Sequence, residues 1–310
     1  MGLRIGVTPG NWQWTGGAAG FFGFVDACEA QGWDSLWLSD RLVGDRLSLE
    51  PVTALAAVAA RTTVLKFGTS VLALPLRNPA VLAKELATVD YLSGGRLLPA
   101  VGLGGDDERE YEATGTRKVE RAGRTDEAIG LLRRLWTEDH VTHHGKYFHL
   151  TDVTVTPKPV FSPHPPLWIG GRTPAAWDRV ARVGDGWLVS QATPGDVAAG
   201  ITGIRAAMVK YGRVIEDDHY GVMLGVYLAA TSEAARERAL LPGFRQRPDA
   251  PLDAYTALGD ADTVLGVIQA YLATGASKFV LRFLCPEREA GEQMALLARA
   301  VLAPAMAWGV

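Results

Sequence analysis

The chain has 310 residues, of which 48% are hydrophobic and 21% charged, and its formal net charge is −3. This composition excludes a disordered chain and argues against nucleic-acid binding, which usually needs a basic surface. Cys28 and Cys285 are too few for a disulfide framework, and the longest apolar run, about residues 53–60, is much shorter than a membrane span. Because residues 1–10 resemble a strand rather than a secretory signal, we expect a cytoplasmic protein with no membrane or nucleic-acid partner.

Apolar strands alternate with helical patterns in the first third of the chain. Pro79 and Gly94 flank one of these helices, and proline at the start with glycine at the end is the order that helix termini favour. The predicted elements here are strands 3–7, 34–38, 64–72 and 96–101 and helices 20–31, 51–60 and 78–92.

The same alternation returns after a less regular stretch. That later part contains strands 167–169, 186–189, 221–229 and 277–282, a hairpin-like piece at 141–150, and helices 121–137, 174–183, 196–211, 232–238, 260–274 and 287–302. Strands that alternate with helices indicate a parallel α/β fold. Eight strands predict a (β/α)8 TIM barrel, as one domain over residues 1–310 with an insertion around 105–165. The alternative architecture is a doubly wound open sheet.

Two glycines stand where a late strand meets a helix. Gly170 and Gly171 follow the strand, and Arg172 and Thr173 precede the helix that begins at Pro174. Free N–H groups and the positive end of a helix dipole make such a junction an anion site, with Thr173 as a cap or a phosphate ligand and Arg172 as added charge. A tight turn that needs glycine explains the same residues, so the motif alone supports phosphate binding and a plain turn equally.

Gly104 and Gly105 follow the fourth strand in a second glycine cluster. The spacing is not that of a dinucleotide-binding fingerprint, because the sixth position lacks glycine and no acidic residue follows at the right distance. The cluster therefore indicates a strand end whose backbone lies close to a ligand or, as the more ordinary alternative, to a neighbouring loop.

Polar residues also follow the second and third strands. In a barrel, the carboxyl ends of the strands face the active-site mouth, so Asp40 and Arg41 are candidates to orient a cofactor or a proton. The hydroxyls of Thr69 and Ser70, next to Val71, would also point to the mouth. The alternatives are loop capping for the first pair and ordinary strand propensity for the second group.

Four histidines and two tryptophans are further candidates for site residues. His140, His143, His144 and His149 have neither the spacing nor the partner ligands of a metal site, and a solvated hairpin explains them better, so we predict no metal. Trp12 and Trp14 follow the first strand, where they would line a pocket for a flat ring or pack in the core. No nucleophile elbow or phosphate-binding Walker loop is present to favour a hydrolase or a kinase.

Four blocks of sequence resemble the luciferase-like monooxygenase superfamily. They are GWDSLWLSD at 32–40, GTSV at 68–71 with RNPA at 77–80, DYLSGGR at 90–96, and WIGG at 168–171 with GDGW at 184–187. The resemblance implies a (β/α)8 barrel that uses a flavin or a deazaflavin. It also implies a homodimer, which nothing in the residues themselves tests.

The resemblance gives roles to the motif residues. The Ser70–Val71 bond falls where many family members have a non-proline cis peptide beneath the tricyclic ring. Gly170, Gly171, Arg172 and Thr173 match the segment that binds the cofactor phosphate, and Asp40 matches a residue beside the ring. The cofactor-binding set that we expect is Asp40, Thr69, Ser70, Val71, Gly104, Gly105, Gly170, Gly171, Arg172 and Thr173. Trp12 and Trp14 are the candidate substrate walls.

Two positions depart from the family pattern. Arg41 stands where family members commonly have histidine, and a guanidinium stays charged and does not shuttle protons near neutral pH. Gly105 stands where the related sugar-phosphate dehydrogenases have a catalytic carboxylate, which leaves Asp106, Asp107 and Glu108 as unranked acids. Both changes put a sugar-phosphate substrate in doubt.

The length and the Thr-Ser-Val strand end resemble the branch that uses the deazaflavin coenzyme F420. We therefore predict an F420-dependent oxidoreductase that transfers hydride to or from a small organic substrate. Asp40 and Arg41 would act at the polar edge of the ring, where Arg41 would stabilise developing negative charge. The alternatives are an FMN-dependent monooxygenase and a non-catalytic barrel that stores a cofactor or senses a ligand.

Overall fold

The computed structural model describes residues 3–239 and 246–308 and contains a curled sheet of parallel strands. Within this part of the chain, eight barrel strands follow one another in sequence order, and the third and fourth are each split into two pieces. The strands are β1 (Arg4–Thr8), β2 (Ser35–Leu38), β3 (Lys66–Thr69) with β4 (Leu72–Ala73), β5 (Leu97–Leu98) with β6 (Ala100–Gly102), β9 (Trp168–Gly170), β10 (Gly186–Ser190), β11 (Tyr220–Leu228) and β13 (Lys278–Phe283).

The split strands close the sheet. β3 pairs with β5, while β4 pairs with β6, which in turn pairs with β9. At the other side, β1 pairs with both β2 and β13. The hydrogen-bonded ring is therefore complete, which confirms the predicted barrel and excludes the open doubly wound sheet.

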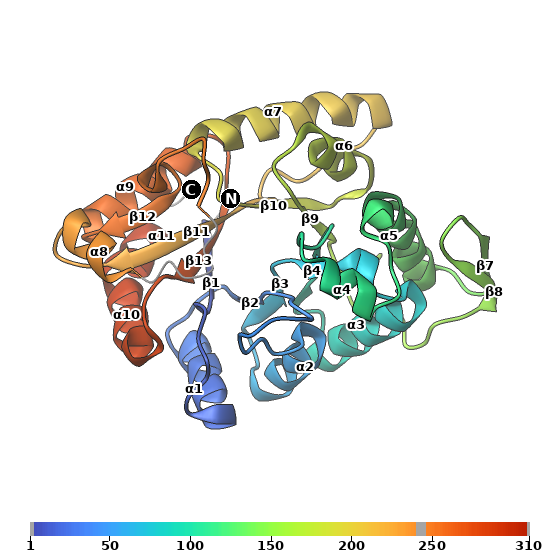
Figure 1. Cartoon of the computed structure of the whole chain (residues 1–310), viewed down its shortest axis with the longest axis horizontal. Helices are drawn as coiled ribbons and strands as arrows, with labels where there is room; N and C mark the ends of the chain where they lie inside the picture. The colour runs from blue at the N-terminus through green and yellow to red at the C-terminus, as the bar shows by residue number, and fades with distance from the viewer. Residues whose placement is uncertain (1–2, 240–245, 309–310) are drawn as a thin grey trace.

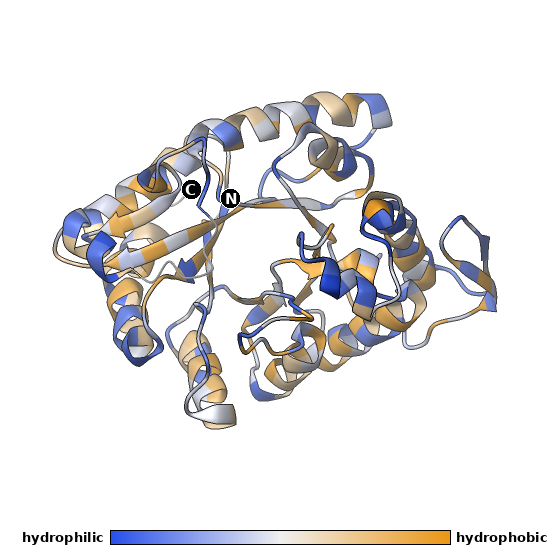
Figure 2. Ribbon diagram, in the orientation of Figure 1, coloured by the Kyte–Doolittle hydropathy of each residue, from blue (hydrophilic) through white to orange (hydrophobic). Residues whose placement is uncertain are grey.

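Helices surround the barrel on all sides in Figure 1. The helices that follow barrel strands are α1 (Gly17–Ala30), α2 (Pro51–Arg61), α3 (Pro79–Ser93), α5 (Arg121–Thr137), α6 (Pro174–Val183), α7 (Pro194–Tyr211), α9 (Ala261–Leu272) and α10 (Ala290–Leu297), and shorter ones are α4 (Glu108–Ala113), α8 (Ser232–Arg238) and α11 (Ala303–Met306). In Figure 2 the hydrophilic residues gather on loops and outer helix surfaces, and the barrel strands are mostly white to orange.

Local sequence signals set the helix ends as predicted. Asn78 caps α3 by accepting hydrogen bonds from the amides of Ala80 and Val81, with Pro79 in the first turn. Gly94 ends the same helix in the left-handed conformation, with φ of 66°. These caps satisfy backbone groups that a buried helix end would otherwise leave without partners.

Large side chains fill the barrel interior opposite glycines. Trp37 and Trp168 are both buried, and their rings meet edge to face at 6.3 Å between centroids. A Cβ on Gly68 would lie 2.9 Å from the Trp37 ring, and one on Gly186 would lie 2.6 Å from Trp168. Glycine at these two strand positions makes room for the indoles, so the interior is a packed core as in other barrels.

Several elements differ from the sequence prediction. Strand 64–72 is interrupted at Ser70 and Val71, and strand 96–101 at Pro99, which has no amide hydrogen to donate to a ladder. The helix expected at 287–302 contains a π-helical turn, Ala298–Leu302. Strand β12 (Thr256–Gly259) and helix α4 were not predicted, because both are short and follow turn-rich segments.

The region between β6 and β9 contains the added elements of the predicted insertion. α4 and α5 are followed by the antiparallel strands β7 (Val141–His144) and β8 (His149–Val153), and their pairing confirms the predicted hairpin. The two strands project to the right of the barrel in Figure 1. The assignment of the whole chain to one domain stays a prediction. None of the helices in the described residues has the length and apolar character required to cross a membrane.

Candidate active site

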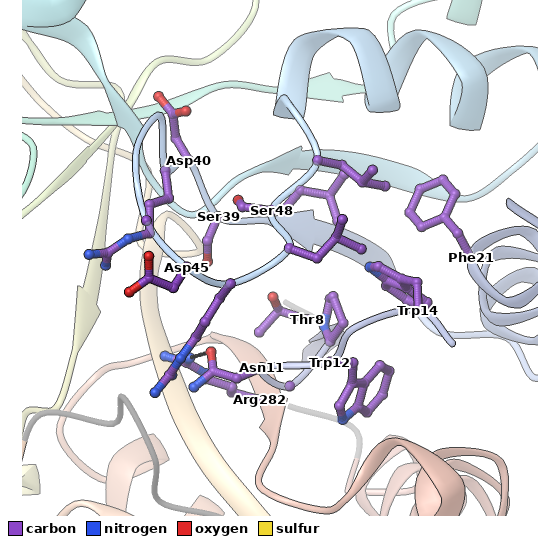
Figure 3. Close-up of a pocket in the computed structure, with 18 of the residues that line it drawn as sticks. Thr8, Asn11, Trp12, Trp14, Phe21, Ser39, Asp40, Asp45, Ser48 and Arg282 are labelled. Atoms are coloured by element: carbon purple, nitrogen blue, oxygen red, sulfur yellow. Dashed lines mark hydrogen bonds between the residues drawn. The ribbon is translucent and has the colours of Figure 1, made fainter. Parts of the chain in front are cut away.

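A cavity of about 470 Å³ opens at the carboxyl ends of β1, β2 and β13 (Figure 3). Thr8 and Leu38, the last residues of β1 and β2, form part of its wall, and the loops that follow these strands supply most of the rest. The volume is in the range of small-molecule sites. Trp12, Trp14, Asp40 and Arg41 all line the cavity, so the structure brings together four of the predicted site residues.

The Ser70–Val71 peptide bond is cis, as the family resemblance implies. A Cβ on Gly170 would lie 3.1 Å from Val71 Cγ1, and one on Gly102 would lie 2.7 Å from Cγ2. The Val71 side chain therefore lies against both glycines. This packing brings the turn after β3 next to the end of β9, so two predicted cofactor segments that are 100 residues apart in sequence are neighbours.

The prediction that the Thr69 hydroxyl points to the mouth is wrong. Thr69 is buried, and its Oγ1 donates to the Ala100 carbonyl at 2.6 Å and accepts from the Ala100 amide at 3.0 Å. It thus completes the ladder where the third and fourth strands are split. Ser70 lies nearer the opening, with its Oγ 3.5 Å from Oγ of Ser39, which lines the cavity.

Asp40 connects the end of β2 to the segment beyond the cis bond. Its Oδ2 accepts from the Ala73 amide at 2.9 Å, and its Oδ1 accepts from Arg77 Nη2 at 3.0 Å. Arg77 also pairs with Glu50, the residue that caps α2. Each carboxylate oxygen therefore has a hydrogen-bond donor, and these bonds fix the position of the Asp40 carboxylate at the edge of the cavity.

Arg41 is exposed and close to an acidic neighbour. Its Nε donates to the Val43 carbonyl at 3.1 Å, and its Nη2 lies 3.8 Å from Asp107 Oδ2. The two-pronged hydrogen bond from Arg109 lowers the pKa of Asp107 to about 2, so this carboxylate is ionised at neutral pH. Asp107, one of the three acidic residues after Gly105, therefore pairs with Arg109 and caps α4.

The junction of β9 and α6 is exposed along residues 171–175. Gly171 has φ of 123°, and a Cβ there would lie 2.7 Å from the Ala176 Cβ, so the chain needs glycine to turn onto the helix. Thr173 Oγ1 accepts from the Ala176 amide at 3.3 Å, which confirms its capping role. Arg172 Nη1 donates to the Gln191 carbonyl at 3.0 Å.

Side chains of α4 pack against the loop that follows β6. The Tyr111 hydroxyl lies within hydrogen-bond distance of the Leu103 and Gly105 carbonyls, and a Cβ on Gly104 would lie 3.1 Å from it. Glu110 is buried, accepts from the Leu42 amide at 3.0 Å, and places Oε2 3.7 Å from a Cβ built on Gly105. A carboxylate therefore lies beside position 105 although that residue has no side chain.

Comparison with known proteins identifies the family. A model described as luciferase-like monooxygenase matches residues 5–301. The chain belongs to the luciferase-like monooxygenase family. Members of this family are oxidoreductases or monooxygenases, and the cis bond and the barrel expected from the family resemblance are both present.

Relatives of this luciferase-like protein use different cofactors. It is 34% identical over 190 residues to an FMNH2-dependent dimethylsulfone monooxygenase of Pseudomonas putida, covering 60% of this chain and 51% of that one. It is 35% identical over 171 residues to an F420-dependent glucose-6-phosphate dehydrogenase of Kineococcus radiotolerans, covering 53% and 50%. The chain thus spans about half the length of the curated relatives it matches. The solved structure of monooxygenase RslO1 from Streptomyces bottropensis has a TM-score of 0.82 at 22% identity and covers 97% of this chain and 99% of that one.

Sequence reasoning missed several residues that line this cavity. Arg282, Asn11 and Arg46 line the cavity but were not singled out. For Arg282 a signal was present, because residues 278, 280 and 282 share one face of a predicted strand and its last member lies at the mouth. Nothing in the sequence neighbourhood of Glu110 predicts that α4 turns its side chain toward Gly105.

The histidines do not form a metal site in the described residues. His140 Nδ1 lies 2.7 Å from Asp152, and His143 Nε2 lies 3.0 Å from Glu127, which also accepts from the amide of Phe148. Within the described ranges, no group of three or more histidine, cysteine, aspartate or glutamate side chains is arranged to hold a metal ion.

Proposed function

We propose that this protein is a coenzyme F420-dependent oxidoreductase that transfers hydride between the deazaflavin and a small organic substrate. The observation that carries the proposal is the packing of Val71 against Gly102 and Gly170, next to the open Gly171 junction. It brings the turn after β3 next to the end of β9, from which the chain leads into α6. The identity to an F420-dependent dehydrogenase supports the same cofactor.

The residues present fit a flat cofactor with an anionic tail. Ser70 and Val71 would support one face of the ring, where side chains at positions 102 and 170 would collide with Val71. The exposed backbone of Gly171 and Thr173, at the positive end of α6, would hold the phosphate. Glycine at positions 102 and 170 therefore gives room to Val71 beneath the proposed ring, and glycine at position 171 lets the chain turn onto α6 at the proposed phosphate site.

When bound, a deazaflavin supplies hydride transfer to or from carbon. The hydrogen bonds from the Ala73 amide and Arg77 to Asp40 would keep the backbone beneath the cofactor ring in place. Arg41 would provide positive charge at the polar edge of the ring without exchanging a proton. Glu110 Oε2, beside Gly105, would hold a carboxylate at the position where the F420-dependent sugar-phosphate dehydrogenases have one.

An FMN-dependent monooxygenase is the alternative, favoured by the 34% identity to a monooxygenase that uses FMNH2. The two proposals differ in ligand and in oxygen use. Titration of the purified chain with F420 and with FMN, followed by cofactor fluorescence, separates them. We expect tight binding of F420, no oxygen consumption, and bleaching or recovery of deazaflavin absorbance with a panel of alcohols, ketones and enones. Tight binding of FMN alone would overturn the F420 proposal, and a bound cofactor with no turnover would favour the non-catalytic barrel.

A negative charge introduced at the junction tests the placement of the phosphate. Gly171→Asp adds a carboxylate where a Cβ would already meet Ala176. Ala175→Asp adds a carboxylate at an exposed first-turn position, where it stabilises a helix. We expect both variants to weaken F420 binding at least about tenfold while Ala175→Asp keeps the thermal stability of the parent. Val214→Asp, exposed on the loop between α7 and β11, is the matched control and should bind normally. Unchanged affinity in both junction variants would contradict this placement.

The expected homodimer and small-molecule substrate stay predictions. Sedimentation velocity of the purified chain tests the first, since a dimer has twice the mass of the chain.

A further inference from the structure

The cavity at β1, β2 and β13 has one aromatic side. Trp12 and Trp14 meet edge to face at 5.6 Å between centroids, and Trp14 meets Phe21 in the same way at 5.3 Å. Trp12 Nε1 donates to the Cys285 carbonyl at 2.9 Å, which fixes the ring in its pocket. The three rings lie together in Figure 3, so this side is a rigid apolar wall.

Another side of the cavity is cationic. Arg282 follows Val280 on the inward face of β13 and donates from Nη2 to Asn11 Oδ1 at 2.7 Å, the dashed bond in Figure 3. Burial lowers the pKa of Arg282, and the nearby positive charge of Arg46 lowers it further, although the group stays ionised. Arg46 and Arg282 both line this cavity and also a smaller cavity beside Gln13, so the two guanidinium groups share one side, where an anion would interact favourably with both.

The acidic residues of the cavity lie apart from the aromatic wall. Four arginines line the cavity, of which Arg41 and Arg109 lie beside Asp107 and the other two are Arg46 and Arg282; the aspartates in the lining are Asp40 and Asp45. Asp40 is already paired with Arg77, which does not line it. In Figure 3 both aspartates lie on the side of the cavity away from the aromatic wall.

From this juxtaposition we propose that the cavity binds an organic anion with a planar aromatic body. The body lies against Trp12 and Trp14, and its carboxylate or other oxyanion lies between Arg282 and Arg46. The inference rests on the proposed function in taking this ligand as the redox substrate. Ser39 lines the cavity 3.5 Å from Ser70, so the bound body adjoins the surface proposed for the cofactor ring. About 470 Å³ accommodates a bicyclic ligand of this kind.

The test uses three probes of one shape and different charge. 2-Naphthoate, neutral 2-naphthamide and cationic 2-naphthylmethylammonium are titrated into the purified chain by calorimetry, first without cofactor and then with saturating F420. We expect naphthoate to bind at least about tenfold more tightly than the amide, the cation to bind weakest, and added salt to weaken naphthoate binding. Equal affinity for naphthoate and naphthamide overturns the proposal.

Two variants and a matched control locate the anion. Arg282→Met and Arg46→Met each remove one guanidinium, from a strand and from a loop, so a folding defect in one leaves the other informative. We expect each to lower naphthoate affinity about tenfold or more and to leave naphthamide affinity unchanged. Arg205→Met removes an exposed arginine on α7, which pairs with Asp217, and should change neither the naphthoate affinity nor the naphthamide affinity. Unchanged naphthoate affinity in both cavity variants overturns the proposal.

The cofactor arm separates this inference from the proposed function. Naphthoate that binds equally well with F420 present supports a substrate site beside the ring. Displacement of naphthoate by F420 assigns the cavity to the cofactor and overturns the inference. Naphthoate binding by a chain that binds no F420 supports the anion site and overturns the proposed function instead.

Discussion

The two ends of strands β2 and β13 place the same kinds of charged residue in opposite environments. At the amino end, Asp34 and Lys278 form an ion pair of 2.5 Å, and the lysine side chain is 1% exposed. At the carboxyl end, Asp40 and Arg282 line an open cavity. The comparison teaches that position along a barrel strand, rather than residue type, decides whether a charge stabilises the fold or faces a ligand.

The amino end is closed by tightly packed groups. Lys278 Nζ lies 5.6 Å from the centre of the Trp37 ring, whose Nε1 donates to Ser35 at 2.9 Å. Burial alone would raise the pKa of the Asp34 carboxyl, but the Lys278 ammonium beside it lowers that pKa below its ordinary value. At the mouth, by contrast, a charged side chain fixes a loop. Glu287, which follows β13, accepts hydrogen bonds from the amides of Gln13 and Thr15 in the loop after β1.

The largest expected effect comes from breaking the pair at the closed end. Asp34→Asn leaves the buried ammonium of Lys278 without its counter-charge and should lower the free energy of unfolding by about 3–5 kcal/mol. Urea denaturation measures it. Asp34→Asn combined with Lys278→Met should recover part of the loss, because no uncompensated charge remains. If Asp34→Asn alone lowers the free energy of unfolding by less than about 1 kcal/mol, the ion pair at the amino ends of the strands does not stabilise the fold as proposed.

The pH dependence of the same pair is a smaller effect. Because the folded pKa of Asp34 is lowered, its stabilisation is fully present above the unfolded value, about 3.9, and is lost as pH falls through the folded pKa. The difference in unfolding free energy between the parent and Lys278→Met should therefore be largest near neutral pH and should narrow as the solution becomes acidic, because the buried Asp34 carboxyl takes up its proton at a higher pH in the variant, which lacks the ammonium, than in the parent. A difference that widens with acid would contradict the assigned direction.

The smallest effect on stability is expected at the mouth. Glu287→Gln removes one charged acceptor from exposed hydrogen bonds to Gln13 and Thr15, so the unfolding free energy should fall by only about 1 kcal/mol. Amide exchange at these two residues should become faster, and naphthoate affinity should fall a few-fold because the loop lines the cavity. Glu292→Gln, exposed on α10, serves as the comparison variant. Exchange that stays equal in both variants would refute the role of Glu287 in holding this loop.

Much of the fold could be predicted because its signals are local. The cap at Asn78, the proline that follows it and the left-handed Gly94 define α3 without any tertiary contact. β12 escaped prediction because four residues carry too little periodicity, and its pairing with β11 is a long-range event.

The site was predictable only in part. The Gly171 junction and the Ser70–Val71 turn were found because their backbone requirements or family blocks are written in consecutive residues. Thr69, which bonds to Ala100, and Glu110, which lies beside Gly105, could not be placed, since each depends on a partner from another strand or helix.

The sequence by itself determined the alternation of strands and helices, the helix ends and the glycines at the strand-to-helix junctions, because each follows from the conformational preferences of neighbouring residues. Only the tertiary structure decided that Val71 lies against Gly170, that Lys278 is buried while Arg282 lines a cavity, and that Trp12 faces the same space as Arg46. The reason is that barrel closure brings distant strand ends together, and no local preference specifies which side chains then share the mouth.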